Sequence, residues 1–187
     1  MKKFFILAAI TFGTFFNAVA QEVTGLELGV DLDLSISQNG GIFGLAPKLK
    51  LENDNPALAY GPSLRFQRIW ANNYLTNNSV GYSVYGGGGF FHYRIENVIY
   101  LGVEAEILRT PITYTFINQP TWVPTVFIGG GLSRDFGKVR INAGLLYDVA
   151  NNPNSPFRRN YFLKKTDASG FQELLPIIYR FTFFFEL

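Results

Sequence analysis

The chain of 187 residues has no cysteine, one histidine and few charged side chains, which make up 16% of the sequence. Without cysteine it can form no disulfide bond, no thiolate metal site and no lipid-modified N-terminal cysteine. The charged fraction lies below the roughly 25% of a typical soluble domain. Hydrophobic residues at 48% and aromatic residues at 17% exclude a disordered chain. The 19 glycines and 9 prolines argue against a helical bundle, and the length predicts one domain.

Residues 1–20 have the three parts of a secretory signal peptide: two lysines at 2–3, an apolar run over 4–16, and the small residues Ala-Val-Ala at 18–20. The apolar run is shorter than the about 20 residues that a membrane-spanning helix needs. Removing the two lysines from the 16 basic residues leaves 14, equal to the 14 acidic residues. The predicted mature domain, 21–187, therefore has no net charge, and nothing supports nucleic-acid binding.

The rest of the chain alternates between apolar and polar residues. From residue 26 to residue 36 every second residue is leucine, valine or isoleucine, and the residues between them are acidic, glycine or serine. This period of two predicts a strand with one apolar face and one polar face. Most such segments have the 9–11 residues that a tilted strand needs to cross a bilayer. The other predicted strands lie near 42–51, 57–69, 80–93, 98–109, 123–134, 138–149 and 174–187.

Tight turns predict which residues face each other, because residues paired across a hairpin have a constant sum of residue numbers. Asn39-Gly40 is the strongest signal for a two-residue turn, and it predicts that Asp31 lies opposite Lys48. Turns centred on 94–97, 135–136 and 54–55 set three further registers. They predict the pairs Phe90–Leu101, Glu104–Gly87, Leu132–Val139, Arg140–Gly131 and Pro47–Pro62.

Eight alternating strands can form two kinds of structure. A water-soluble barrel or sandwich turns its apolar face inward, whereas a transmembrane barrel turns it toward lipid. The polar face is rich in glycine, serine and alanine, which suits a narrow interior. The last strand is so aromatic that it would promote aggregation in water. We therefore expect a closed eight-stranded antiparallel transmembrane barrel. Its expected lipid-facing aromatic residues near strand ends are Phe43, Tyr60, Phe66, Trp70, Tyr82, Phe90 and Tyr147.

A signal peptide, eight alternating strands and a terminal aromatic strand resemble the small eight-stranded outer-membrane β-barrels of the OmpA/OmpX-like group. The resemblance covers residues 21–187. It implies the outer membrane of a Gram-negative bacterium, with both termini in the periplasm and the long loops outside. In that group the last strand is the signal for the outer-membrane insertion machinery. The matching residues are Tyr179, Phe181, Phe183 and Phe185, with Leu187 in place of the usual terminal phenylalanine.

Charged residues on the polar face are expected inside the barrel. Eight strands enclose an interior that side chains just fill, and buried charges are tolerated only when they are paired. The alternation therefore predicts a structural charge network, with a proton path or a narrow pore as the alternative. The residues of this network are Glu27, Asp31, Asp33, Lys48, Lys50, Arg65, Glu104, Glu106, Arg140 and Arg180.

Three smaller features have weaker functional interpretations. His92 is predicted to face lipid as an interfacial residue, because one histidine alone specifies neither a catalyst nor a metal site. Gly86 and Gly88 are predicted to face lipid and to leave a shallow groove for an acyl chain or a partner barrel. Basic residues in the last long loop predict either binding of lipopolysaccharide phosphates or an acidic partner, or simply a solvated loop. They are Arg158, Arg159, Lys164 and Lys165.

These patterns predict an integral outer-membrane protein with a structural or accessory role, as a subunit of a larger complex or a presenter of surface loops. No catalytic, metal-binding or cofactor-binding residue is predicted. Two other classes stay open: a lipid A-modifying enzyme, which needs a catalytic cluster at the outer rim, and a narrow channel, which needs an open lumen. The expected partners are membrane lipid, lipopolysaccharide, the insertion machinery and a larger outer-membrane complex.

Overall fold

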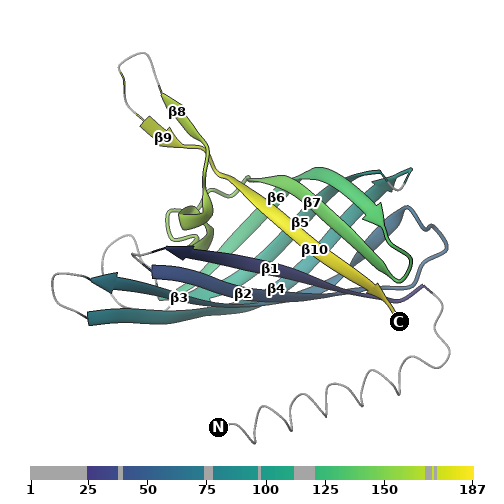
Figure 1. The fold of residues 1–187 in the computed structure, drawn as a ribbon, viewed down its shortest axis with the longest axis horizontal. Helices are drawn as coiled ribbons and strands as arrows, with labels where there is room; N and C mark the ends of the chain where they lie inside the picture. Colours follow the sequence, from purple (N-terminus) through teal and green to yellow (C-terminus); the bar gives the residue numbers. More distant parts are fainter. Residues whose placement is uncertain are drawn as a thin grey trace, which may run out of the picture.

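The structure is a computed structural model that describes residues 25–37, 40–73, 78–96, 98–111, 121–166, 170 and 172–187. The predicted signal peptide, residues 1–20, lies outside this part. Eight strands form a closed antiparallel barrel (Figure 1), which confirms the predicted fold class. The barrel strands are β1 (Glu27–Ser37), β2 (Gly40–Lys50), β3 (Leu58–Asn73), β4 (Asn78–Ile95), β5 (Ile99–Thr110), β6 (Thr121–Asp135), β7 (Val139–Asp148) and β10 (Ile177–Glu186).

The connection between β7 and β10 has structure of its own. It contains a short 3₁₀ helix, η1 (Pro156–Asn160), and two short strands, β8 (Lys164–Thr166) and β9 (Gln172–Leu174). These two strands pair with each other and form a hairpin that stands away from the barrel (Figure 1). None of the described residues belongs to a helix with the length and apolarity to span a bilayer.

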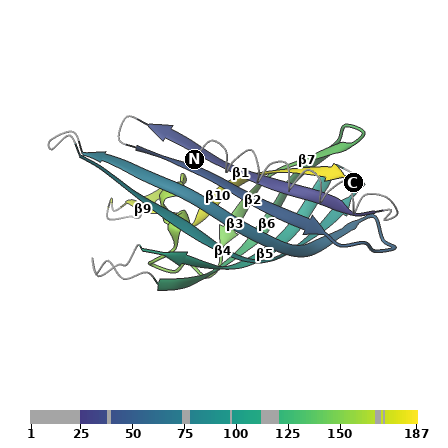
Figure 2. The ribbon, with the colours of Figure 1, turned by 90° about the horizontal axis from the view of Figure 1, so that it is seen from below.

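The two ends of the described chain meet at one end of the barrel. The backbone N–H of Leu187 donates to the carbonyl of Leu26 at 3.1 Å, and Figure 2 shows β1 beginning where β10 ends. The connections after β2, β4 and β6 lie at this same end, which we call the terminal end. The connection that carries η1 and the hairpin lies at the opposite end, which we call the long-loop end. An even number of strands produces this arrangement.

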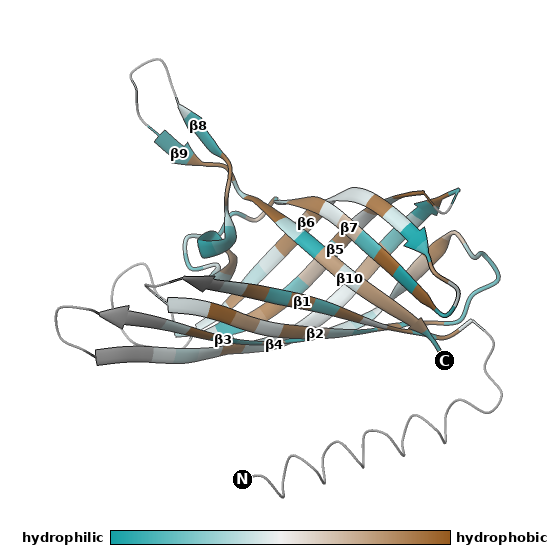
Figure 3. Ribbon diagram, viewed as in Figure 1, coloured by the Kyte–Doolittle hydropathy of each residue, from teal (hydrophilic) through white to brown (hydrophobic). Residues whose placement is uncertain are grey.

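The outside of the barrel is apolar. Hydropathy alternates along the strands in Figure 3, and large side chains such as Leu64 and Ile107 are 64% and 57% exposed. In water each such side chain would forgo about 1.5–3 kcal/mol of burial free energy. Most charged residues in the middle of the same strands, such as Arg65 and Glu106, point inward. This inverted pattern is the one that a membrane-spanning barrel requires.

The first hairpin is shifted by two residues from its predicted register. Ser37 pairs with Gly40, so Asp31 lies opposite Ala46 rather than Lys48. The centre of this hairpin therefore lies one position earlier in the sequence than the predicted Asn-Gly centre. Because the shift is even, every side chain of the hairpin keeps its predicted face.

Two further registers differ by an even number of residues. Lys48 pairs with Ser63 between β2 and β3, a shift of two. Asp135 pairs with Arg140 between β6 and β7, a shift of four that moves the turn to 136–138. Both corrections keep the predicted faces. They remove the predicted pairs Pro47–Pro62, Leu132–Val139 and Arg140–Gly131.

The register between β4 and β5 is wrong by three residues, and this odd shift has a larger consequence. Ile95 pairs with Ile99, so Phe90 lies opposite Glu104. The connection has three residues and begins at Glu96, which adopts a positive φ of 47°. Every side chain of β4 therefore faces the side opposite to the one predicted. The residues that turn inward include Tyr82, Val84, Gly86, Gly88, Phe90 and His92.

The inward glycines of β4 allow an unusually close approach to β5. A Cβ atom built at Gly88 would lie 1.8 Å from the carbonyl oxygen of Ala105, and one at Gly86 would lie 2.0 Å from that of Ile107. No side chain fits at such distances from backbone atoms. The glycines therefore permit the tight β4–β5 contact that helps to close the barrel.

We expect Gly88→Ala to destabilise the barrel strongly and Gly89→Ala to do so much less. The added methyl at position 88 collides with backbone, whereas a Cβ at Gly89 lies 3.3 Å from the carbonyl oxygen of Gly61. Overpacking costs about 1–3 kcal/mol and occasionally more. Urea unfolding in detergent and heat-dependent gel mobility measure the difference. Equal stability of the two variants would show that the close approach of the strands is not needed.

Candidate functional site

The lumen contains a network of ion pairs that converges on Asp31 of β1. Its Oδ2 lies 3.0 Å from Lys48 Nζ, 3.0 Å from Arg180 Nη1 and 3.1 Å from Arg65 Nη2. The hydroxyl of Thr182 donates to Asp31 Oδ1 at 2.6 Å. Because these partners come from β2, β3 and β10, one carboxylate links four strands across the interior.

Arg65 extends the network toward the long-loop end. Its Nε donates to Glu106 Oε2 at 2.7 Å, and its Nη1 donates to Asp33 Oδ2 at 2.7 Å. Gln67 donates to the same oxygen of Asp33 at 2.8 Å. The Arg65 side chain has no exposure to solvent. An unpaired guanidinium in this position would cost several kcal/mol, so these carboxylates are required where the arginine is buried.

Glu104 of β5 is the second carboxylate at the centre of the lumen. It accepts a hydrogen bond from Lys48, and its Oε2 lies 3.3 Å from Arg180 Nη2. Its Oε1 also lies 3.1 Å from His92 Nε2. Glu104 thereby ties β5 to the strands that meet at Asp31. The cross-section at this level is filled with charged side chains that bind one another.

A second, smaller group of charges lies toward the terminal end. Arg94 donates from both Nη atoms to the carboxylate of Glu27, at 2.8 and 2.6 Å, and Lys50 Nζ lies 3.2 Å from the same carboxylate. Arg140 pairs with Asp135 at 2.6 Å, where Asp135 is 43% exposed. Of the residues predicted for the lumen network, Arg140 therefore has its ion pair at the rim, and the other nine are brought together in the interior.

His92 does not face lipid as predicted but lies in the lumen. It is 1% exposed, and its ring packs against Phe90 and Tyr100 with centroid distances of 5.2 and 5.1 Å. Neither His92 nor Arg94 is among the residues predicted for the interior. The sequence does contain a signal for their inward orientation, because both alternate with the apolar Phe91 and two further apolar residues at 93 and 95. Among the described residues, no three His, Cys, Asp or Glu side chains are arranged to hold a metal ion.

Phe157 of η1 closes the long-loop end of the lumen. It is fully buried and meets Phe127 edge to face at a centroid distance of 4.8 Å. The guanidinium groups of Arg65 and Arg180 lie 5.1 and 5.5 Å from its ring centroid, within the range of a cation–π contact. The ring thus separates the charge network from the outside. The barrel residues of the same apolar cluster are Ile42, Ile69, Val84, Leu108, Phe127, Leu146 and Ile178.

Asp148, the last residue of β7, holds the loop in place. Tyr161 donates its hydroxyl to Asp148 Oδ2 at 2.8 Å, and the Asn151 backbone N–H donates to Oδ1 at 3.0 Å. The Ser155 hydroxyl lies 3.4 Å from Oδ2 and also accepts from the Phe157 N–H, which caps η1. Burial raises the pKa of Tyr161 well above its ordinary value of 10.0, and the neighbouring carboxylate acts in the same direction. We call Asp148, Tyr161 and Ser155 the latch.

The basic residues of the loop do not form one cluster. Arg158 donates to the Asn151 side chain at 3.0 Å and lies over the Tyr161 ring, so it belongs to the latch region. Arg159 lies 5.6 Å from the ring centroid of Tyr82 at the barrel mouth. The remaining two, Lys164 and Lys165, are exposed on the hairpin. A single phosphate-binding site made of all four is therefore not what the structure presents.

The terminal strand has the geometry that its sequence predicts. Tyr179, Phe181 and Phe185 are between 40% and 45% exposed on the outer face, and Phe183 lies on the same face. Phe184, between them, points inward and is 1% exposed. Leu187 follows the end of β10. The outer face of β10 is therefore a continuous aromatic strip toward lipid.

The described residues fold as a small eight-stranded transmembrane barrel. No family model matches the sequence, and no curated protein is significantly similar to it. Among solved structures, the outer-membrane protein Ail of Yersinia pestis in a phospholipid bilayer nanodisc matches with 11% sequence identity and a TM-score of 0.42. The match covers 88% of this chain and 100% of the Ail chain.

We expect Asp31→Ala to lower the free energy of unfolding by about 3–5 kcal/mol, because it leaves buried cations without a shared partner. Adding Lys48→Ala should recover part of the loss, since one of those cations is then gone. The matched control, Asp135→Ala, removes a partly exposed pair and should cost about 0–1 kcal/mol. Urea unfolding in detergent measures all three. Strictly additive losses for Asp31 and Lys48 would contradict the coupling.

The latch should weaken in alkaline solution. The folded state keeps the Tyr161 proton at a pH where the unfolded chain has lost it, because its folded pKa is the higher one. The stabilisation is therefore complete below pH ~10 and is lost as the pH rises through the raised pKa. Urea unfolding of the barrel in detergent at increasing pH measures this loss of stability. Tyr161→Phe should abolish the alkaline step, and an unchanged step in this variant would assign it to another group.

Proposed function

We propose that this chain is an outer-membrane barrel of a Gram-negative bacterium that displays its last long loop to a partner and catalyses no reaction itself. In this proposal the barrel is a membrane-embedded accessory subunit with a sealed lumen. The observation that carries it is the anchoring of the loop: Phe157 fills the lumen mouth and Tyr161 binds Asp148. A loop held at its base in this way presents the β8–β9 hairpin in a defined position.

The filled interior supports a structural role over transport. The largest buried side chains include Arg65, Arg180 and Lys48, each 2% exposed or less. They are bound to carboxylates on several strands, so moving any one of them exposes an unpaired charge. Ion passage would require several such pairs to break together. A planar bilayer containing the purified barrel should therefore show negligible conductance.

The exposed surface of the β8–β9 hairpin supports a role in presenting this loop to a partner. All six of its strand residues are exposed, and it carries the apolar Leu174 beside the basic Lys164. Exposed backbone at a strand edge can pair with a strand of another protein. The neighbouring Phe162 and Leu163 add apolar surface at the base, with 44% and 39% exposure. These features give a partner both backbone and side-chain contacts.

Replacing residues 164–174 by a short glycine-serine linker should abolish a larger native complex while the barrel still folds. Phe157 and the latch residues all precede this segment, so the closed mouth of the lumen is left intact. Native gels of detergent extracts from cells that express the protein at its natural level measure the complex. Heat-dependent gel mobility of the same extracts measures the folded barrel.

The matched control is Leu101→Ala, which removes a lipid-facing side chain of β5 near the terminal end and should keep the complex. Persistence of the complex without the hairpin would contradict display by this loop. Absence of any complex in the unaltered protein would contradict an accessory role. Steady ion-selective conductance of the purified barrel would replace the proposal with a channel.

A further inference from the structure

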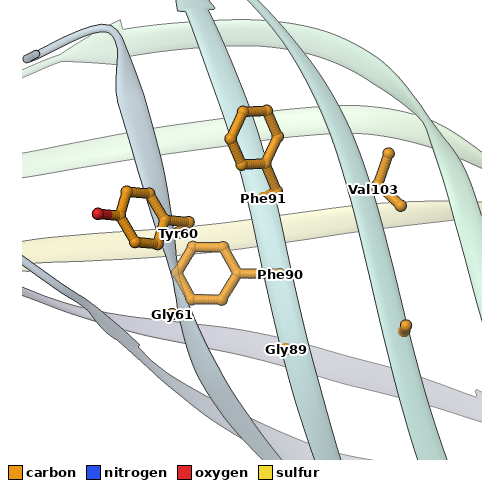
Figure 4. Close-up of a pocket in the computed structure, with 7 residues that line it drawn as sticks. Tyr60, Gly61, Gly89, Phe90, Phe91 and Val103 are labelled. Carbon is orange, nitrogen blue, oxygen red and sulfur yellow. The ribbon is translucent and has the colours of Figure 1, made fainter.

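An apolar groove lies on the outer surface of β3, β4 and β5. Figure 4 shows Tyr60 on β3 and Val103 on β5 on either side of β4, which carries Gly89 and Phe91. The rings of Tyr60 and Phe91 stack at 6.5 Å. The predicted groove at Gly86 and Gly88 is thus displaced by one residue. The groove measures ≈ 410 Å³, and its lining residues are Tyr60, Gly61, Gly89, Phe90, Phe91, Val103 and Ala105.

Beyond the groove, the outer surface of β4 continues toward the long-loop end. Gly87 lies between Leu64 and Ile107, which are paired to it from the two neighbouring strands and are 64% and 57% exposed. Tyr85 ends this path. From Tyr85 to Phe91 the strand advances about 20 Å, and with a tilt of about 45° this corresponds to about 14 Å along the bilayer normal. The path therefore matches about half of a hydrocarbon core of about 30 Å, which is the depth of one leaflet.

Two arginines flank β4 at the Tyr85 end of the groove. Arg109 of β5 donates from Nη1 to the Tyr85 hydroxyl at 2.8 Å and lies 5.9 Å from the ring centroid. Arg68 of β3 donates to the Ser83 hydroxyl at 3.1 Å. These contacts position both guanidinium groups and leave most of their five donors free to bind an anion.

This face has positive charge without a compensating acid. Among the described residues, neither Arg68 nor Arg109 has a carboxylate within ion-pair distance. The outward-facing described positions of β3, β4 and β5 carry no aspartate or glutamate, because Glu104 and Glu106 both point inward. A second copy of the barrel, related by a twofold axis along the membrane normal, would bring these arginines opposite one another at equal depth. Repulsion between the arginines disfavours such a dimer, whereas an anionic lipid headgroup would neutralise their charge.

We propose that this surface is a binding site for one membrane lipid with an anionic phosphate headgroup. The phosphate binds Arg68 and Arg109, as phosphate–arginine geometry favours. An acyl chain follows β4 past Gly87 and lies in the groove between Tyr60 and Val103. A soluble phosphate compound would leave this apolar groove uncovered. The inference rests on the proposed membrane location but not on the role of the hairpin.

A tryptophan placed in the groove can report on the lipid beside it. The two natural tryptophans are replaced by phenylalanine, and Phe91→Trp supplies the reporter. A second protein carries Leu145→Trp instead, on the outer face of β7. Both are reconstituted in vesicles of phosphatidylcholine that contain the same fraction of a mid-chain brominated lipid, either phosphatidylglycerol or phosphatidylcholine. Bromine quenches tryptophan fluorescence on contact.

We expect brominated phosphatidylglycerol to quench the groove reporter more than brominated phosphatidylcholine, with an apparent preference of about fivefold for each arginine. The β7 reporter should be quenched equally by both lipids. Arg68→Gln with Arg109→Gln should abolish the preference at the groove. Arg134→Gln, an exposed arginine of β6 near the terminal end, is the matched control and should keep it. Ala105→Leu fills the groove and should reduce quenching by both lipids.

Equal quenching of the groove reporter by the two lipids would overturn the site, and so would a preference that survives loss of both arginines. Cross-linking between two copies through the groove would assign it to a dimer instead. If no brominated lipid quenches the β7 reporter, the barrel is not in the bilayer, and the proposed location fails together with the lipid site. A quenched β7 reporter with no preference at the groove overturns the lipid site alone.

Discussion

The carboxylate of Asp31 is the interaction on which the interior of the barrel depends. A chain that turns leucine and phenylalanine outward has to place its charges inside, where losing water costs several kcal/mol for each ion. Lys48, Arg65 and Arg180 share this one carboxylate, and they are carried by three different strands. Those strands cannot separate without breaking ion pairs inside the barrel. Barrel closure and charge pairing therefore stabilise each other.

The Asp31–Lys48 pair also shows how side-chain length relaxes the demand for an exact register. The sequence predicts this pair from a turn centre that is two residues off, and the two residues are in fact diagonal neighbours, since Asp31 lies opposite Ala46. Diagonal positions on one face of an antiparallel pair are within reach of a long side chain. An error of two residues thus keeps the interior composition, because the faces are unchanged.

An error of three residues changes the interior composition, because it exchanges the two faces of the strand. Prediction from the sequence therefore fails at β4. The period of two identifies the eight strands and the inward charges of β1, β2, β3 and β5, because apolar and polar residues alternate in the middle of these strands. In β4 the four glycines of 86–89 provide no contrast between the faces. The predicted orientation of β4 therefore depended on the turn between β4 and β5. In that turn Glu96 takes a positive φ, which a non-glycine residue seldom adopts. His92 was therefore assigned to the wrong side, and Arg94 was placed in the turn although it belongs to β4.

The position of Phe157 at the lumen mouth could not be predicted from periodicity either, since residues 150–163 follow no period of two. The local signal was Ser155-Pro156, a helix cap followed by proline at the first helical position, but it does not say that the next residue enters the lumen. The buried position of Phe157 follows from the side chains that line the lumen below it. Arg65 and Arg180 offer two cations to an aromatic face, and Phe127 offers an edge. By covering them, Phe157 excludes water and strengthens the ion pairs below it. The charge network thus stabilises the position of Phe157 and its loop, and Phe157 in turn keeps water away from the network. The closed lumen and the fixed position of the hairpin therefore result from the same packing.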